Sequence, residues 1–252
     1  MDDATLFARQ LATLHRFYGV VVNGRKDSRL IERQGLTAAV VAATPERSIF
    51  NGVVYDDQQA LADALPELAG TYEAAGVRAW MVWSPRERSD ARDLLQRSGH
   101  VLDANPAAMA LELGSFERRP SDSIDLDPEP DMADVARMND AAYGYTDQAF
   151  VRAVGDVPAA SVHAYVARVD GSAAASTVTF DHGDDCYVGF VATLPPARGR
   201  GLATELMTHA VFDARERGCA TATLQATTMG QPIYARLGFR DLGPIEMWER
   251  RT

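Results

Sequence analysis

The segment from Thr193 to Leu206 constrains the fold more than any other part of the sequence. A β-rich run ends at Pro195 and Pro196, a short loop of glycine and arginine follows, and an amphipathic helix begins near Leu202. Glycines let backbone amides approach a ligand without a Cβ in the way, and the first turn of a helix leaves its N–H groups unpaired. The helix dipole adds partial positive charge there. The segment therefore predicts a strand, an anion-binding loop and a helix.

The type of anion follows in part from spacing. Arg198 and Arg200 place two cations in the loop, so we expect a phosphate or pyrophosphate group. A nucleoside-triphosphate loop, GxxxxGK[ST], is excluded because the segment has no lysine. A dinucleotide fingerprint, GxGxxG, would need glycine at the position of Thr204. Taken alone, the segment is also compatible with a purely structural turn.

Two motifs in this region resemble those of the GNAT superfamily of acyl-CoA-dependent N-acyltransferases. Residues 198–203 read Arg-Gly-Arg-Gly-Leu-Ala, which is similar to the family signature R/Q-x-x-G-x-G/A. Tyr234 and the pair Gly238-Phe239 resemble the later Y-x-x-x-G-F segment. The motifs stand in the family's order, about 35 residues apart, and the resemblance covers roughly residues 120–250.

The resemblance implies an N-acetyltransferase that uses acetyl-CoA as cosubstrate and needs no metal ion. In such enzymes the strand before the loop pairs its backbone with the pantetheine arm, and the loop and helix start hold the pyrophosphate. The positions that match are Val191, Ala192 and Thr193 on the strand, and Arg198, Gly199, Arg200, Gly201, Leu202, Ala203 and Thr204 in the loop and helix. Tyr234 is the implied general acid for the leaving thiolate. Because a phenol has a pKa of about 10, its position must compensate for its weak acidity.

The chain departs from the family pattern before Tyr234. Many members carry an asparagine there that binds pantetheine, whereas this chain offers Thr227 or Thr228 as weak substitutes. Tyr143 and Tyr145 are either acceptor-pocket residues or surface aromatics.

No carboxylate stands out as a general base. Asp181, His182 and Glu246 lie on or beside expected strands, where solvated strand-end residues are more typical than catalytic bases. Bulk water or a water chain would then deprotonate the amine.

A polar, turn-rich stretch between Leu113 and Ile124 predicts a domain boundary. We expect residues 1–115 to form a degenerate GNAT-like domain without a cofactor loop, and residues 116–252 to form the catalytic domain. The fold class is α/β (α+β), each domain having a mixed, mostly antiparallel sheet flanked by helices.

Apolar periodicity predicts the individual elements. The expected helices span 4–17, 58–75, 87–98, 131–142, 147–154, 201–217 and 230–237. The expected strands span 20–22, 49–55, 79–83, 109–113, 161–169, 173–182, 186–194, 219–226 and 239–249, with a further strand from residue 100 onward.

The two parts of the chain share a similar order of strand, turn, helix, glycine and strand at an offset of 139 residues. This similarity favours a duplication over coincidence. Ser98-Gly99 then corresponds to Leu237-Gly238, and Leu95 corresponds to Tyr234. The first part therefore lacks the acid. Before its helix near 58–75 it carries Asp56 and Asp57 in place of glycines, and these charges would repel a pyrophosphate. We expect only the second domain to bind acyl-CoA.

The composition of the chain limits the classes of molecule that it is expected to bind. The formal net charge of −10 disfavours a nucleic-acid surface and favours a cationic acceptor, either a small-molecule or a peptide amine. No apolar run is long enough to span a membrane, and the acidic N-terminus is unlike a secretory signal, so we expect a cytoplasmic protein. Cys186 and Cys219 are expected as free thiols. Lys26, the one lysine, lies in a polar stretch, which makes Schiff-base chemistry improbable.

The sequence alone leaves two other interpretations of the function open. It also leaves the oligomeric state open. The GNAT-like fold could serve as a non-catalytic acyl-CoA or metabolite-binding module, or the protein could be an α/β protein with a structural turn. Pairing of the last strands would allow a homodimer.

Overall fold

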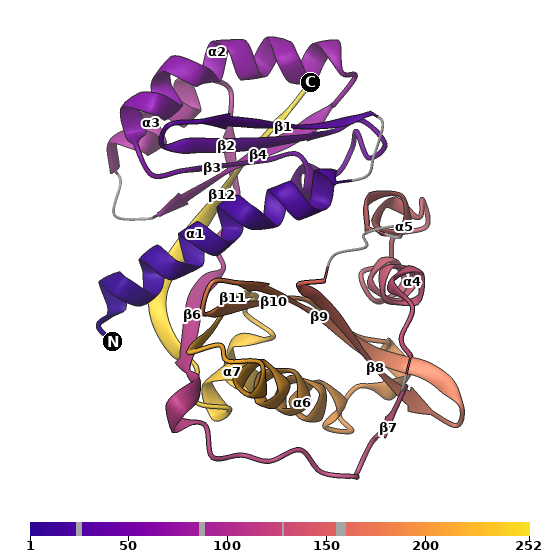
Figure 1. Ribbon diagram of the computed structural model, residues 1–252. Coiled ribbons are helices and arrows are strands. Elements are labelled where there is room, and N and C mark those ends of the chain that lie inside the picture. The colour runs from indigo at the N-terminus through magenta and orange to yellow at the C-terminus, as the bar shows by residue number, and fades with distance from the viewer. Residues whose placement is uncertain (24–26, 86–88, 128, 155–159) are drawn as a thin grey trace. The chain divides into compact units, whose positions relative to one another are not determined.

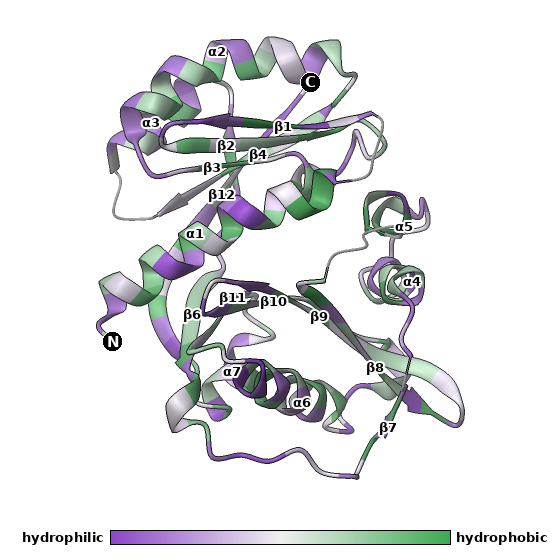
Figure 2. Ribbon diagram, viewed as in Figure 1, coloured by the Kyte–Doolittle hydropathy of each residue, from purple (hydrophilic) through white to green (hydrophobic). Residues whose placement is uncertain are grey.

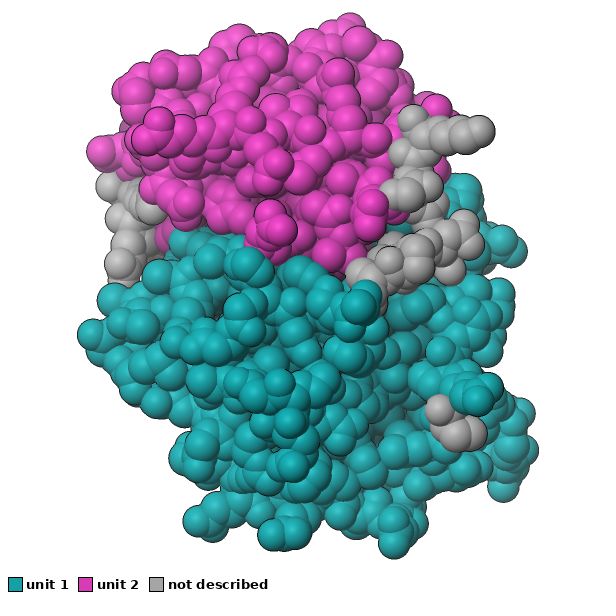
Figure 3. Space-filling model, in the orientation of Figure 1, with its two compact units in different colours: residues 1–13, 108–242 teal, residues 14–107, 243–252 magenta. Residues whose placement is uncertain are grey.

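The computed structural model describes residues 1–23, 27–85, 89–127, 129–154 and 160–252. These form two compact units: unit 1 comprises residues 1–13 and 108–242, and unit 2 comprises residues 14–107 and 243–252 (Figure 3). The units are not separated by a single cut between residues 115 and 116. The first 13 residues group with the later part of the chain, and the last ten group with the earlier part. That residues 1–115 are a degenerate GNAT-like domain stays a prediction.

The sheet of unit 2 has the order β1-β2-β3-β4-β12, and β5 pairs with the other edge of β12. Its pairs are antiparallel except β3 with β4. The strands are β1 (Ser28–Arg33), β2 (Leu36–Val41), β3 (Gly52–Tyr55), β4 (Ala79–Pro85), β5 (Val101–Ala104) and β12 (Arg240–Arg251), the last contributing its residues from Gly243 onward. The helices are α2 (Gln58–Ala74), α3 (Ser89–Arg97) and the part of α1 (Asp3–Val22) from Leu14 onward.

Helix α2 shows how local sequence sets an element of unit 2. Leu61, Leu65 and Leu68 recur every three or four residues and are buried against the sheet. Hydrophobic and hydrophilic residues accordingly alternate around α2 (Figure 2). The Asp57 carboxylate caps the helix by accepting hydrogen bonds from the backbone amides of Gln59 and Ala60.

The sheet of unit 1 has the order β6-β11-β10-β9-β8-β7. Strands β7 to β10 pair antiparallel, and β10 pairs parallel with β11. The strands are β6 (Ala107–Glu112), β7 (Asp125–Leu126), β8 (Val162–Val169), β9 (Ser172–His182), β10 (Asp185–Thr193) and β11 (Thr221–Ala226). The helices are α4 (Met132–Ala142), α5 (Ala149–Val154), α6 (Leu202–Glu216) and α7 (Gln231–Arg236), and α1 contributes its residues up to Thr13.

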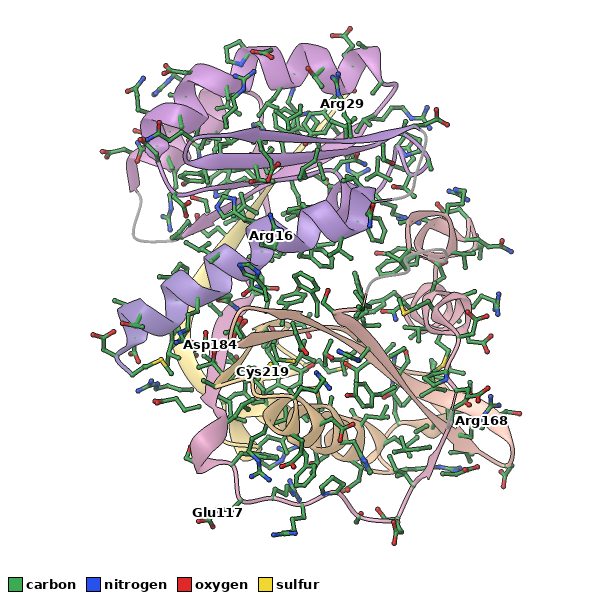
Figure 4. All side chains as sticks on the ribbon, viewed as in Figure 1. Arg16, Arg29, Glu117, Arg168, Asp184 and Cys219 are labelled. Atoms are coloured by element: carbon green, nitrogen blue, oxygen red, sulfur yellow. The ribbon has the colours of Figure 1, made fainter. Side chains whose placement is uncertain are left out.

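Helices cover both faces of this sheet, with α4 and α5 on one face and α6 and α7 on the other (Figure 1). Neighbouring residues of β8 show why. Val166 packs against Val135 of α4, whereas Ala167 packs against Leu202 and Leu206 of α6. Successive side chains of a strand point to opposite faces, so both faces of β8 are buried. At the outer edge, Arg168 of β8, labelled in Figure 4, forms an ion pair with Asp127 beside β7.

A buried carboxylate joins three elements of unit 1. Asp185, at the start of β10, is 2% exposed and accepts hydrogen bonds from the hydroxyls of Thr13, Thr221 and Thr223 at 2.7–2.8 Å. Burial raises the pKa of Asp185, and the three hydroxyls oppose that rise. The neighbouring Asp184, labelled in Figure 4, forms an ion pair with Arg9 of α1 at 2.8 Å.

Most expected elements are confirmed, including the three successive strands expected at 161–169, 173–182 and 186–194, which are β8, β9 and β10 and pair antiparallel. The expected strand 20–22 is wrong: these residues form the last turn of α1, where Phe17, Tyr18 and Val21 continue a helical apolar spacing. Strands β1, β2 and β7 were not predicted. Lys26 and the first two residues of the helix expected at 87–98 lie outside the described residues.

Two further expectations concern the cysteines and the membrane. Cys186 and Cys219 are both free, as expected; both are also buried, and burial raises the pKa of the Cys219 thiol to about 12. Within the described part of the chain, no helix has both the length and the apolar character needed to cross a membrane.

Two glycine substitutions in unit 2 should have opposite effects on stability. A Cβ at Gly52 would lie 1.8 Å from the hydroxyl of Tyr18, which accepts a hydrogen bond from the Trp83 indole at 2.9 Å. We expect Gly52→Ala to lower the free energy of unfolding by about 1–3 kcal/mol. Gly70 in α2 has open space around it, so Gly70→Ala should raise it by about 0.5–1 kcal/mol.

Tryptophan fluorescence during urea denaturation measures both changes, because all three tryptophans belong to unit 2. An unchanged midpoint for Gly52→Ala would contradict the packing of Tyr18 against β3.

Candidate active site

Strands β10 and β11 part in the middle of the unit 1 sheet. Their parallel pairing joins Asp185 with Thr221 and Tyr187 with Thr223, and the described ladder extends no further. Residues 188–193 of β10 and 224–226 of β11 thus continue beyond it without pairing to each other. The carboxyl ends of adjacent parallel strands are a usual place for ligands in α/β proteins. This parting is the centre of the candidate site.

A β-bulge changes the direction of β10 beside the parting. Gly189 pairs with Val178 of β9 and Ala192 pairs with Ser176, so β10 holds one extra residue between the two pairs. Phe190 in the bulge has φ +54°, an unusual conformation for a bulky residue. The bulge lies directly before Val191, Ala192 and Thr193, whose backbone, by the resemblance to GNAT enzymes, is predicted to pair with the pantetheine arm.

The loop after β10 is open to a ligand. Gly199 and Gly201 have φ of +78° and +80°, and a Cβ at either would meet nothing within 4 Å. Gly201 is the N-cap of α6, and the first amide with an intrahelical partner is that of Glu205. The amides of Leu202, Ala203 and Thr204 therefore remain available, as at any helix start. Such a row of amides fits a pyrophosphate group.

Arg198 has a position that the sequence did not predict. Its guanidinium donates hydrogen bonds to the carbonyl oxygens of Thr193 and Ala142, both at 3.2 Å. It thereby ties the end of β10 to the last turn of α4. Arg200 is exposed at the rim of the loop. Arg198 is exposed as well, but its guanidinium is already engaged by those two carbonyl oxygens.

Tyr234 is held in place from several sides. It lies on α7, is 7% exposed, and its ring is 6.0 Å from that of Phe239. Gly230 makes room for it, since a Cβ there would lie 2.8 Å from the ring. Burial, and then the neighbouring phenol of Tyr143, raise the pKa of Tyr234. The hydroxyl is protonated at neutral pH, as an ordinary phenol is, and the raised pKa makes it a weaker acid, so its position must compensate.

Thr227 lies in the turn before α7. Its hydroxyl accepts a hydrogen bond from the Gly230 amide at 3.2 Å, and its carbonyl accepts one from the Gln231 amide at 2.9 Å. These bonds shape the turn that positions α7. The predicted pantetheine contact of Thr227 stays a prediction.

The sequence did not predict three residues of the candidate site, which are Tyr187, Gln225 and Asn139. Tyr187 of β10 donates a hydrogen bond to the Oε1 atom of Gln225 of β11 at 2.7 Å, across the parting. Burial, and then Tyr234, raise the pKa of Tyr187, so the two phenols are electrostatic neighbours. Asn139 of α4 donates to the carbonyl of Phe190 in the bulge at 3.1 Å. Only the alternation along β10, which places Tyr187 on the face of Asp185, could have indicated one of them.

The remaining candidates fall into two groups. Tyr143 and Tyr145, between α4 and α5, are 53% and 36% exposed with ring centroids 6.4 Å apart, and Tyr143 neighbours Tyr234 electrostatically. Both therefore remain acceptor-pocket candidates.

The possible bases have structural partners. Burial raises the pKa of Asp181, but hydrogen bonds from Arg217 and its charge hold it below the usual value. Glu246 belongs to unit 2, where it accepts from Arg92 and from the Trp248 indole. Their contacts favour structural roles.

Unit 1 is an α/β domain whose mixed sheet parts between two parallel strands, with a glycine-lined helix start beside the parting that could hold an anion. Residues 127–239, which lie within unit 1, match the Acetyltransferase (GNAT) family. The α/β fold class with a mostly antiparallel sheet between helices is confirmed.

The chain is also similar to a curated protein in sequence and to solved structures in fold. An N-alpha-acetyltransferase, MAK3, from Arabidopsis thaliana is 39% identical over 56 residues, which cover 21% of this chain and 30% of that protein. The chain thus spans about a third of this curated relative. A GCN5-related N-acetyltransferase from Kribbella flavida has a TM-score of 0.67 at 17% identity, over 94% of this chain and 95% of its own. A tandem GNAT protein of clavulanic acid biosynthesis has a TM-score of 0.58 at 15% identity, over 90% and 84%. These structures share the fold.

A charge reversal in the loop tests the anion site. Gly201→Asp places a carboxylate at the start of α6, where the amides would meet the pyrophosphate, so we expect acetyl-CoA affinity to fall at least about tenfold. Gly218→Asp is the matched control, because Gly218 also has positive φ and open space but follows the other end of α6. Calorimetric titration measures both. Equal losses in the two variants would contradict the assignment of the loop.

Proposed function

We propose that unit 1 transfers an acetyl or other short acyl group from acetyl-CoA to a primary amine by direct attack in a ternary complex. The parting of β10 and β11 beside the bulge, with the open loop at its end, is the observation that carries this proposal. The match of residues 127–239 to an acetyltransferase family supports it.

The proposed cosubstrate fits the residues present. Pantetheine would lie along the backbone of residues 191–193, and its pyrophosphate would meet the amides that follow Gly199 and Gly201. Both glycines leave the space that such a group needs. Arg200 would add charge at the rim.

The chemistry divides between backbone and side chain. The amine nitrogen attacks the thioester carbonyl carbon, and an amide of residues 191–193 donates to the oxygen as negative charge builds. The C–S bond then breaks, and Tyr234 gives its proton to the leaving thiolate. The amine loses a proton to solvent, and the Tyr234 phenolate takes one back from solvent. No cysteine, serine or lysine stands in a recognisable nucleophile motif, which favours direct transfer.

The acceptor is either a small-molecule or a peptide amine. The name of the Arabidopsis relative, an N-alpha-acetyltransferase, supports a protein substrate. The net charge of −10 favours a cation and disfavours a nucleic acid. Location in the cytoplasm and assembly into a homodimer stay predictions.

The second candidate is a module that binds acyl-CoA without turning it over. Such a module would need the loop but not a buried phenol. Tyr234 is 7% exposed and Gly230 leaves space for its ring, which favours the enzyme.

We infer that unit 2 binds no acyl-CoA. The start of α2 already holds the Asp57 carboxylate, which accepts from Gln59 and Ala60. A pyrophosphate would have to displace it against its charge. We therefore expect one acetyl-CoA per chain, and calorimetry giving two equivalent sites would refute this.

Tyr234→Phe tests the proposed acid. We expect turnover to fall about ten- to hundredfold, because the phenol proton is lost, while acetyl-CoA affinity stays within about twofold. Tyr165→Phe, which removes a phenol from β8, is the control and should leave turnover unchanged. Thiol release with an amine library measures turnover, and calorimetry measures affinity. Unchanged turnover of Tyr234→Phe would remove its role, and acetyl-CoA binding without turnover of any amine would favour the binding module.

A further inference from the structure

Asn139 has a polar side chain that is buried in an apolar environment. It lies on α4 and is 1% exposed. Around it, α4 packs on the sheet through Val135 and Met138, with Phe190 and Leu194 of the site strand and its loop against the same cluster. Burying an amide among such groups costs free energy unless its hydrogen bonds repay it.

The hydrogen bonds of Asn139 are directed at the bulge. Its Nδ2 atom donates to the carbonyl of Val135, one turn earlier, and to the carbonyl of Phe190, both at 3.1 Å. Its Oδ1 atom is buried and has no hydrogen-bond partner among the described residues. The two carbonyls fix the amide orientation, since Oδ1 in their place would repel both. The side chain thus contributes one long-range bond, to the bulge.

Phe190 needs such a restraint. A φ of +54° is unfavourable for a bulky side chain, and it persists only where surrounding contacts enforce it. The contacts that restrain it include the bond from Asn139 and the edge-on packing of Phe150, with ring centroids 5.2 Å apart. If Phe190 relaxed to an extended conformation, the register of β10 would slip by one residue and residues 191–193 would turn to the opposite faces.

We propose that Asn139 is a positioning residue that holds the β10 bulge and so aims the backbone of residues 191–193 at the thioester. This inference rests on the proposed function for its catalytic meaning. Its structural part, the control of the bulge by Asn139, stands on the contacts alone.

Two variants separate this role from simple packing. Asn139→Leu keeps a similar volume, suits the apolar cluster and removes the unpaired Oδ1 atom, so we expect the melting temperature not to fall. Asn139→Ala removes the same bond with a smaller side chain, in case the leucine is not accommodated. Thr208→Val is the matched control, because it too replaces a buried polar group on the other face of the sheet. Among the described residues, the Thr208 hydroxyl bonds only to the Thr204 carbonyl within α6.

Hydrogen exchange of the backbone amides of residues 190–193 is the first measurement, because it needs no substrate. We expect exchange there to accelerate at least about tenfold in Asn139→Leu and to stay unchanged in Thr208→Val. Exchange unchanged in both Asn139 variants would overturn the inference. An acceleration spread evenly over unit 1, with a lowered melting temperature, would also overturn it, because that outcome indicates packing alone.

The ratio of acetyl-CoA affinity to CoA affinity is the second measurement. An amide that meets the thioester carbonyl favours acetyl-CoA, so we expect Asn139→Leu to reduce this ratio about three- to tenfold. Faster exchange with an unchanged ratio would reject the catalytic part. A wild-type protein that binds neither compound would reject the proposed function instead, while the exchange experiment would still decide whether Asn139 holds the bulge.

Discussion

The site depends on two parallel strands that are joined at one end and separate at the other. Asp185 joins them, because its buried carboxylate accepts bonds from Thr221 and Thr223 of β11 while its own strand continues into the bulge. A buried carboxylate without such donors would be costly. Its three hydroxyl partners therefore fix where the pairing begins, and the bulge fixes where it cannot continue.

The two units show how one element, a helix start, can be used in opposite ways. In α6 the N-cap is a glycine, so no side chain caps the amides of the first turn. In α2 the N-cap is Asp57, whose carboxylate fills the same position. The physics is identical in both cases, since a helix start attracts negative charge. One unit supplies that charge itself, whereas the other leaves room for a ligand.

The sequence predicted those features that depend on neighbouring residues. The glycine loop, the helix that follows it and the helix of Tyr234 each follow from short motifs, and the structure has all three. The bulge at Phe190, the bond from Asn139 and the turn of Arg198 toward Ala142 join residues far apart in the chain. No local pattern encodes them. The strand expected at 20–22 failed for a related reason, because valines suit a strand but tertiary packing continued α1 through them.

The division of the chain between the units bears on how the protein is made. Residues 1–13 belong with residues 108–242, and residues 243–252 belong with residues 14–107. During synthesis the earliest segment must therefore wait for partners such as Asp185, which binds Thr13. The sheet of unit 2 lacks β12 until residues 243–252 have been synthesised and have left the ribosome. Neither unit can finish folding on a half-made chain, so both reach their native state late, through contacts of long sequence separation.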